Sequence, residues 1–557
     1  MRRFQVMTVV LAGVLFTSSA ASAKVLLVGS YHGIRGGYKT IQAAVDAAAP
    51  GDWILVGPGD YKTRSSTAPS SAADHPAGVL ITKAGLHIRG MNRNTVIVDG
   101  TKSGAPCSNK GADQNFGPSS SSGPLGLNGI LVWKADNVWV QNLTACNFLG
   151  GSGTAGNEIW WNGGDGSGQI GGWGFDGSYL NATSTYYKDE STAAAYGIFS
   201  SNWSGGTWYQ DYTSNFNDSG FYVGACQQMC NQTLNRVWSE YNALGYSGTN
   251  SGGQMVIENS QWDNNEDGFD TNSQNNTDFP SPQDGACPNG GTSPITHTHS
   301  CWVFMNNYVH DNNNPNVPSS GAAAAGPVGT GMSLSGGRDD TVMNNRFVRN
   351  GAWGTIFVPY PDTETPPPNA PACAGGTGSG STCNYDDWGN ALLNNTYSGN
   401  GFFGNATNGD FGEITTEPGH PINCFVGNSD TSGTVTSSPP TLQTTNSNCG
   451  QMAVAPDPNP AFTAQVLCDS MFEGPQTPCP PGANYPRRTQ IIMHPLPAAS
   501  DLPTMPNPCA GVPTNPWCGT TAAATRNKRH GHRKGHRAKP THRAISRPAR
   551  RAAGFTG

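Results

Sequence analysis

Carboxyl, amide and hydroxyl side chains are concentrated between Asn264 and Asn272, where the chain reads Asn-Asn-Glu-Asp-Gly-Phe-Asp-Thr-Asn. Two carboxyls that face one glycosidic bond can serve as general acid and base. Carboxylate oxygens can also hold Ca²⁺, a hard cation that prefers oxygen ligands. We therefore predict that Asp267 and Asp270 are catalytic residues, and that Glu266, Asp267 and Asp270 are the ligands of Ca²⁺ if this ion is bound.

A structural interpretation of the same stretch stays open at this point. Glu266 and Asp267 precede a glycine and suit a turn, and Asp270 can be a solvated side chain on the outside of a strand. The two interpretations differ in one respect, because only the catalytic one requires these side chains to converge on a groove.

Glycine recurs at a nearly fixed interval in the centre of the chain. The recurring positions are Gly197, Gly220, Gly245 and Gly268, and then Gly331 and Gly354. Asparagine stands three residues before three of these glycines, at Asn217, Asn242 and Asn265. A period of about 23 residues indicates a solenoid. Amides stacked at one turn can hydrogen-bond from coil to coil, which suits a β-helix with coils about 4.8 Å apart.

Two other repeat architectures fit the sequence less well. Leucine-rich repeats have a similar length but require a Leu-x-x-Leu-x-Leu pattern, which is absent here, and propeller blades run to about 40 residues or more. A parallel β-helix is therefore the predicted fold.

Stacked coils would place equivalent residues in columns. The residue after each glycine is mostly apolar and should face inward, so the second and fourth residues should face outward. The outward columns contain Tyr222, Ser247, Asp270 and Ser333, and beside them Thr249 and Asn272.

These columns would line a groove. We predict that Tyr222 carries protons in the reaction, as an alternative to His299 from the overhanging loop 273–300. The predicted substrate-binding residues are Ser247, Thr249, Asn272 and Ser333.

The N-terminal region supports the same fold. A strand at Val25–Val28 is followed by apolar residues at helical spacing over 40–48, and then by Pro50-Gly51-Asp52-Trp53-Ile54-Leu55-Val56, a turn and a buried strand. These residues resemble the N-terminal cap and first coils of the pectin-lyase-like superfamily, and the resemblance implies a right-handed parallel β-helix. The helix would cover the open end of the stacked strands.

The candidate site also resembles two motifs within that superfamily. Asp267-Gly268-Phe269-Asp270 is similar to part of the Asn-Thr-Asp-Gly-x-Asp motif of polygalacturonases, and Gly268-Phe269-Asp270 to part of the Tyr-Gly-Phe-Asp-Pro-His motif of alginate epimerases. Both matches are incomplete. The Asp-Asp, Gly-His-Gly and Arg-x-Lys elements of polygalacturonases do not occur in order, and Thr271-Asn272 replaces the Pro-His of the epimerases.

The ends and the cysteines indicate export. Residues 1–23 combine two arginines, a short apolar run and Ala21-Ser22-Ala23, which is typical of a signal peptide. All 14 cysteines follow it, so disulfides are expected, mostly between near neighbours. The expected pairs are Cys226/Cys230, Cys287/Cys301, Cys373/Cys383, Cys468/Cys479 and Cys509/Cys518. A zinc site at Cys226 and Cys230 lacks a second pair at zinc spacing.

The chain divides into four predicted regions. The signal peptide (1–23) precedes the β-helix (24–412), a Pro- and Cys-rich C-terminal wrap or cap (413–525) and a disordered basic tail (526–557). Residues 526–551 hold 11 of the 31 Lys and Arg residues and no acid, so the rest of the chain is acidic.

Two functions follow from this organisation. The first is an enzyme, a polysaccharide lyase, epimerase or glycoside hydrolase, that acts on an extracellular and acidic polysaccharide. The second is a non-catalytic structural or binding protein on the cell envelope. Either protein would be a secreted monomer with no membrane span and no specific nucleic-acid partner, and the tail would bind anionic polymers.

Deletion of residues 526–557 tests the role of the tail. A polybasic segment binds polyanions through charge, so the truncated protein should be released from isolated envelopes at low salt, as the full protein should be at high salt. Co-sedimentation measures both. An unchanged distribution after deletion would remove the tail from envelope binding.

Overall fold

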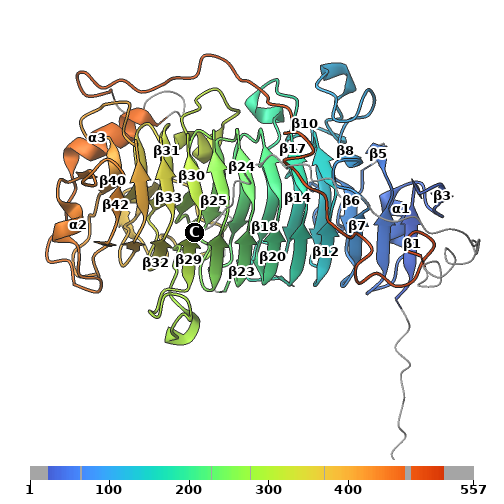
Figure 1. Cartoon of the computed structure of the whole chain (residues 1–557), viewed down its shortest axis with the longest axis horizontal. Helices are drawn as coiled ribbons and strands as arrows, with labels where there is room; N and C mark the ends of the chain where they lie inside the picture. Colours follow the sequence, from blue (N-terminus) through green and yellow to red (C-terminus); the bar gives the residue numbers. More distant parts are fainter. Residues whose placement is uncertain are drawn as a thin grey trace, which may run out of the picture. The chain divides into compact units, whose positions relative to one another are not determined.

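The computed structural model describes residues 23–62, 66–227, 229–275, 278–368, 370–470 and 478–519. Residues up to Pro513 form one unit, in which the chain winds through three long parallel sheets in turn (Figure 1). Most of the predicted signal peptide and all of the predicted basic tail lie outside the described residues.

Each coil contributes one strand to each sheet, in the order sheet I, sheet II, sheet III. Sheet I consists of β1 (Val25–Val28), β4 (Trp53–Val56), β7 (His87–Gly90), β12 (Val138–Gln141), β16 (Phe175–Ser178), β20 (Gly206–Tyr209), β23 (Gln232–Asn235), β26 (Met255–Glu258), β29 (Trp302–Met305), β32 (Asp340–Met343), β38 (Ala391–Leu393) and β41 (Cys424–Val426). Sheet II consists of β5 (Gly59–Lys62), β8 (Val96–Asp99), β13 (Thr144–Cys146), β17 (Asn181–Thr183), β21 (Tyr212–Ser214), β24 (Trp238–Glu240), β27 (Gln261–Asp263), β30 (Tyr308–His310), β33 (Arg346–Val348), β39 (Thr396–Ser398) and β42 (Ser429–Asp430). Sheet III consists of β6 (Ala77–Ile81), β11 (Asn128–Trp133), β14 (Asn157–Asn162), β18 (Tyr196–Ser201), β22 (Ser219–Gly224), β25 (Leu244–Thr249), β28 (Asp270–Asn272), β31 (Thr330–Ser335), β34 (Trp353–Val358), β40 (Gly409–Glu413) and β43 (Ser437–Ser438). The predicted parallel β-helix is confirmed.

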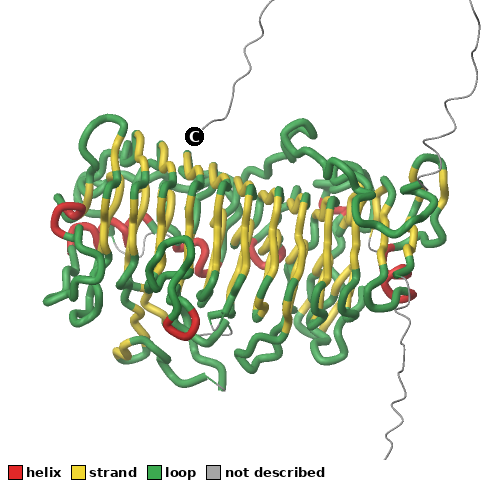
Figure 2. The backbone as a smooth tube through the Cα atoms, turned by 60° about the horizontal axis from the view of Figure 1, so that its bottom comes forward, coloured by secondary structure: helices red, strands yellow, loops and turns green. Residues whose placement is uncertain are grey.

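The strands of each sheet lie side by side along the length of the unit, and most loops project from the corners between sheets (Figure 2). The interior is one continuous apolar core that runs from the N-terminal coils to Phe425 and Leu442. The residues predicted to face inward after each glycine are fully buried in it, and they are Ile198, Phe221, Tyr246, Phe269 and Met332.

The recurring glycines occupy positions where the next coil comes very close. A Cβ atom at Gly245 would lie 2.2 Å from the carbonyl oxygen of Gly268, and one at Gly331 would lie 2.6 Å from that of Gly354. Glycine is therefore required here by the spacing between coils, since any larger side chain would push them apart.

The predicted asparagine ladder is present between sheets II and III. Side-chain amides bond in sequence from Asn242 to Asn265, Asn312, Asn350 and Asn400, at 3.0 to 3.2 Å. Each Oδ1 also accepts the backbone N–H of the preceding ladder residue. Asn217 lies outside the ladder, because its amide donates to the backbone oxygen of Glu190 instead.

The N-terminal end is covered as predicted. The helix α1 (Ile41–Ala47) begins at Thr40, whose side chain accepts a hydrogen bond from the backbone N–H of Ala43. Its buried residues Ile41, Ala44 and Val45 join the core.

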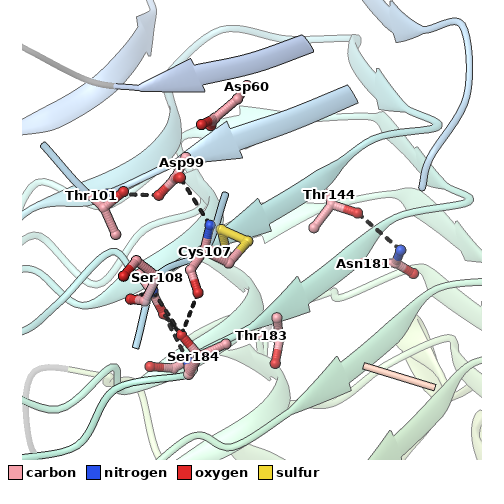
Figure 3. The surroundings of a disulfide bond; sticks show 12 residues. Asp60, Asp99, Thr101, Cys107, Ser108, Thr144, Asn181, Thr183 and Ser184 are labelled. Carbon is pink, nitrogen blue, oxygen red and sulfur yellow. Dashed lines mark hydrogen bonds between the residues drawn. A yellow bond between two sulfur atoms is a disulfide. The ribbon is translucent and has the colours of Figure 1, made fainter. Parts of the chain in front are cut away.

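Six disulfides lie within this unit, and no cysteine among the described residues is free. Four of them join the predicted near neighbours, whereas Cys107–Cys146 and Cys424–Cys449 were not predicted. Cys107–Cys146 ties the long loop after β8 to β13, and Asp99 accepts the backbone N–H groups of Thr101 and Cys107 beside it (Figure 3).

The parallel coils extend past residue 412 to β43. The helices α2 (Leu442–Thr445) and α3 (Pro460–Asp469) follow, and the chain then runs back towards the N-terminal coils as an extended strap, residues 484–510 (Figure 1). The strap is held by hydrogen bonds such as His494 N to Asn215 Oδ1 (2.9 Å) and Arg89 Nη1 to Ala510 O (2.7 Å). Among the described helices, none is long and apolar enough to cross a membrane.

The asparagine ladder should be a major source of stability. Asn312→Ala removes bonds to Asn265, Asn350 and the oxygen of Trp262 and leaves buried polar groups unpaired. We expect the free energy of unfolding to fall by about 3 kcal/mol. Urea unfolding measures the change, and Asn109→Ala, at an exposed asparagine outside the ladder, is the matched control. Equal effects of the two variants would refute the role of the ladder.

Candidate functional site

A pocket of about 740 Å³ lies on the outer face of sheet III. Its floor is formed by side chains of β22, β25, β28, β31 and β34, which are successive strands of that sheet. One wall comes from the 3-10 helix η4 (Gly321–Ala325) with Gly326 and Pro327, and from the end of α3. The opposite wall comes from Gln274, Asp278 and the segment from Pro359 to Glu364.

The predicted outward columns are confirmed by the strand register. Tyr222 pairs with Ser247, Ser247 with Asp270, and Asp270 with Ser333. Thr249 pairs with Asn272 in the neighbouring column. All six side chains line the pocket, because alternation along parallel strands directs each of them outward.

Asp270 is the best-placed carboxyl of the floor. Ser333 and Ser335 donate hydrogen bonds to its Oδ1, at 2.5 and 3.0 Å. Burial raises the pKa of Asp270 to about 6, although the two serine hydroxyls favour its ionised form. Among the described residues none donates to Oδ2, so this oxygen is available to a ligand or water in the pocket.

Asp267 is not one of the residues that line the pocket, although it lies next to the lining residues Ser333 and Gly326. It is fully buried, and it accepts hydrogen bonds from Phe269 N (3.2 Å) and Ser333 Oγ (3.1 Å). Burial and the neighbouring charge of Asp270 raise the pKa of Asp267 well above its ordinary value. Asp267 and Asp270 therefore share the hydroxyl of Ser333.

Glu266 is not one of the residues that line the pocket. It is fully buried, and burial raises its pKa to about 8 despite the nearby guanidinium groups of Arg488 and Arg487. Among the described residues, no group of three or more His, Cys, Asp or Glu side chains is arranged to hold a metal ion. Ca²⁺ binding by Glu266, Asp267 and Asp270 stays a prediction.

His299 lies outside the pocket lining. Its Nε2 is 2.8 Å from Oδ1 of Asp339, and its side chain is 60% exposed. The loop that carries it divides into two parts, because Gln274 and Asp278 line the pocket whereas the later part is held at another corner by the Cys287–Cys301 disulfide. The expectation that the whole loop overhangs the groove is therefore corrected for its second half.

Three pocket carboxyls, Asp218, Asp278 and Glu364, were not found from the sequence. Asp218 precedes β22, and the hydroxyl of Tyr196 donates to its Oδ2 at 2.8 Å. Burial and the charges of Asp278 and Asp270 raise the pKa of Asp218 to about 7, against the effect of that hydrogen bond. Asp278 accepts from the hydroxyl of Tyr222 at 2.8 Å, and burial raises its pKa to about 6. The charges of Asp278 and Asp270 thus act on Asp218 within the pocket.

The raised pKa of Asp270 has a consequence for stability. The folded protein binds a proton at Asp270 up to about pH 6, whereas the unfolded chain loses it near pH 4, so the contribution of this residue becomes unfavourable as pH rises through that window.

Asp270→Asn should therefore raise the free energy of unfolding by up to about 3 kcal/mol at pH 8. At pH 4 the substitution should change that free energy little. Urea unfolding at both pH values measures this, with the exposed Asp46→Asn as control. A gain of equal size at both pH values would contradict the assignment.

Comparison with known proteins adds to the description of the fold. No protein-family model matches the sequence. No curated protein matches it either. Among solved structures, the pectate lyase Pel9A is 13% identical, with 76% of this chain and 80% of that chain covered and a TM-score of 0.34. The A-module of the mannuronan C-5 epimerase AlgE6 from Azotobacter vinelandii is 12% identical, with coverages of 71% and 90% and a TM-score of 0.32. A family 28 exopolygalacturonase from Yersinia enterocolitica is 11% identical, with coverages of 73% and 76% and a TM-score of 0.40.

At these identities and scores the likeness transfers no activity to the chain. The fold is established by the strand order, by the coil-to-coil register and by the capping helix. The chain is a right-handed parallel β-helix protein.

Proposed function

We propose that the pocket on sheet III hydrolyses a glycosidic bond of an extracellular polysaccharide. The observation that carries this proposal is the presence of two carboxyls, Asp218 and Asp270, in one pocket with pKa values raised to about 7 and about 6. Carboxyl pairs with such pKa values are suited to acid–base work near neutral pH.

The environments of the two carboxyls suggest separate roles. Asp218 has the higher pKa and keeps its proton longer, so it is assigned as the general acid that protonates the leaving oxygen. Asp270 is held by two serine hydroxyls that favour its ionised form, and its Oδ2 faces the pocket, so it is assigned as the base that activates water.

The two carboxyls come from different coils. Asp218 stands directly before β22, whereas Asp270 begins β28, two coils further along sheet III. They are also offset along the strand direction, because Ser219 pairs with Leu244, and Leu244 bridges Asp267, three residues before Asp270. A sugar bound between the two carboxyls would contact Tyr222 on β22 and Ser247 on β25.

Elimination or epimerisation of a uronate is less well supported. Both reactions need a positive group near the substrate carboxylate. The described lining contains Asp218, Asp270, Asp278 and Glu364 but no Lys, Arg or His. An acidic polysaccharide therefore stays a prediction from the sequence, and it is included in the test below.

Export is part of the proposal. Disulfides persist in oxidising compartments, and this unit contains six of them. The predicted signal peptide supports the same location.

Hydrolysis is tested by incubating the mature chain with neutral, amino-sugar and uronate polysaccharides, with and without Ca²⁺. We expect new reducing ends without unsaturated products, and a rate that is highest between about pH 6 and 7. Asp218→Asn and Asp270→Asn should each lower kcat by about 10²–10⁴-fold, and Asp46→Asn should leave it unchanged.

Two outcomes would overturn the assignment. Unsaturated products that require Ca²⁺ would establish a lyase instead. No turnover of any polymer, with tight binding that survives both substitutions, would support the non-catalytic alternative.

A further inference from the structure

We propose that the pocket on sheet III selects sugar chains that carry protonated amino groups. This inference rests on the proposed function, because it names the class of substrate that the same pocket takes. Two observations carry it. The first is which hydrogen-bonding groups the lining residues offer, and the second is that the described lining contains carboxyl groups but no Lys, Arg or His.

The lining of the pocket is rich in carboxyl groups. Asp218, Asp270, Asp278 and Glu364 supply four carboxyl groups from four separate segments, and no described lining residue carries a positive charge. Asp278 and Glu364 lie on the same wall and are close enough for the charge of Glu364 to act on Asp278. A cation placed between them would be attracted by both.

Four hydroxyl donors of the lining already bond to its carboxyls. The hydroxyls of Tyr196 and Tyr222 donate to Asp218 and Asp278, and those of Ser333 and Ser335 donate to Asp270. These hydroxyls leave Oδ2 of Asp270 open, and a ligand that brings its own donors can reach it.

An independent observation points the same way. Asn272 lines the pocket and is 6% exposed, and its buried Oδ1 accepts no hydrogen bond from any described residue. An unpaired buried acceptor is costly, and a donor from a ligand would relieve that cost. Asn272 lies beside the carboxyl column, since it is two residues after Asp270 on β28.

An ammonium group meets all of these requirements. It supplies three donors and a positive charge and accepts no hydrogen bond. The hydroxyls of a neutral sugar both donate and accept, so they satisfy the lining only in part. A uronate brings a further negative charge into a cavity that already holds four carboxyl groups, and repulsion opposes its entry.

The geometry separates selection from cleavage. Asp278 and Glu364 would hold the ammonium group against one wall, and Asp218 and Asp270 would act on the glycosidic bond over the floor. Tyr222 connects the two regions, because it lies in the floor column and donates to Asp278.

Binding to the unmodified mature chain tests the inference directly. Calorimetry at pH 7 compares a β-linked glucosamine oligosaccharide with its N-acetylated counterpart of the same length and with a uronate oligosaccharide. We expect Kd to be at least tenfold lower for the amine form than for the acetylated form. This difference should shrink when NaCl rises from 20 to 500 mM, because screening weakens charge attraction.

Variants then locate the preference. Asp278→Asn together with Glu364→Gln should reduce the amine preference to less than threefold, whereas Asp501→Asn, on the exposed strap, should retain it. Circular dichroism and the retained affinity for the acetylated chain show whether the double variant has folded.

The outcomes distinguish this inference from the proposed function. Equal affinity for amine and acetylated chains, or preference for the uronate, would overturn the amino-sugar assignment and leave hydrolysis standing. Amine preference without cleavage of any chain would confirm the selection and overturn hydrolysis.

Discussion

Coil-to-coil stacking in register is the constraint on which the rest of this structure depends. Because each residue of sheet III pairs with its counterpart one coil away, side chains far apart in sequence become neighbours on one outer face. Tyr222 and Asp270 are 48 positions apart in the sequence, yet only one strand separates them. The pocket is a product of this register, since a slip of one residue would turn its floor into the core.

Two features hold the register. Glycines at the start of the sheet III strands allow adjacent coils to approach until a Cβ atom would collide with backbone, and the asparagine ladder joins the coils at the preceding corner. Close approach and hydrogen bonding act at neighbouring positions, so each coil has one favoured alignment with the next. Fixed alignment is also what a catalytic pair requires, because two carboxyls work together only at a defined separation.

The sequence predicts the parts of the site that follow the repeat and misses those that do not. Tyr222, Ser247, Thr249, Asp270, Asn272 and Ser333 could be found because glycine spacing and strand alternation determine their direction. Asp278 belongs to an insertion whose path has no periodicity, and Asp218 stands before the strand rather than on the outward column.

His299 was placed wrongly for the same reason. It is close to Asp270 in sequence, but the Cys287–Cys301 disulfide holds the second half of its loop away from the pocket lining. Glu266 and Asp267 show a further limit, because a run of acidic residues does not reveal that these two are fully buried and do not line the pocket.

The walls connect the site to the C-terminal part of the chain. Val466, Leu467 and Ser470 come from the end of α3 and its continuation, and they complete a pocket whose floor was formed some 200 residues earlier. Arg487, at the start of the strap, donates to the backbone oxygens of Asp469 and Ser470 and fixes that turn. Burying several carboxyls in one cavity is unfavourable unless their surroundings are rigid enough to prevent both collapse and solvation. The stacked coils provide that rigidity from below and the wrapped C-terminal segment provides it from the side, so the cap and the strap belong to the site as much as the strands do.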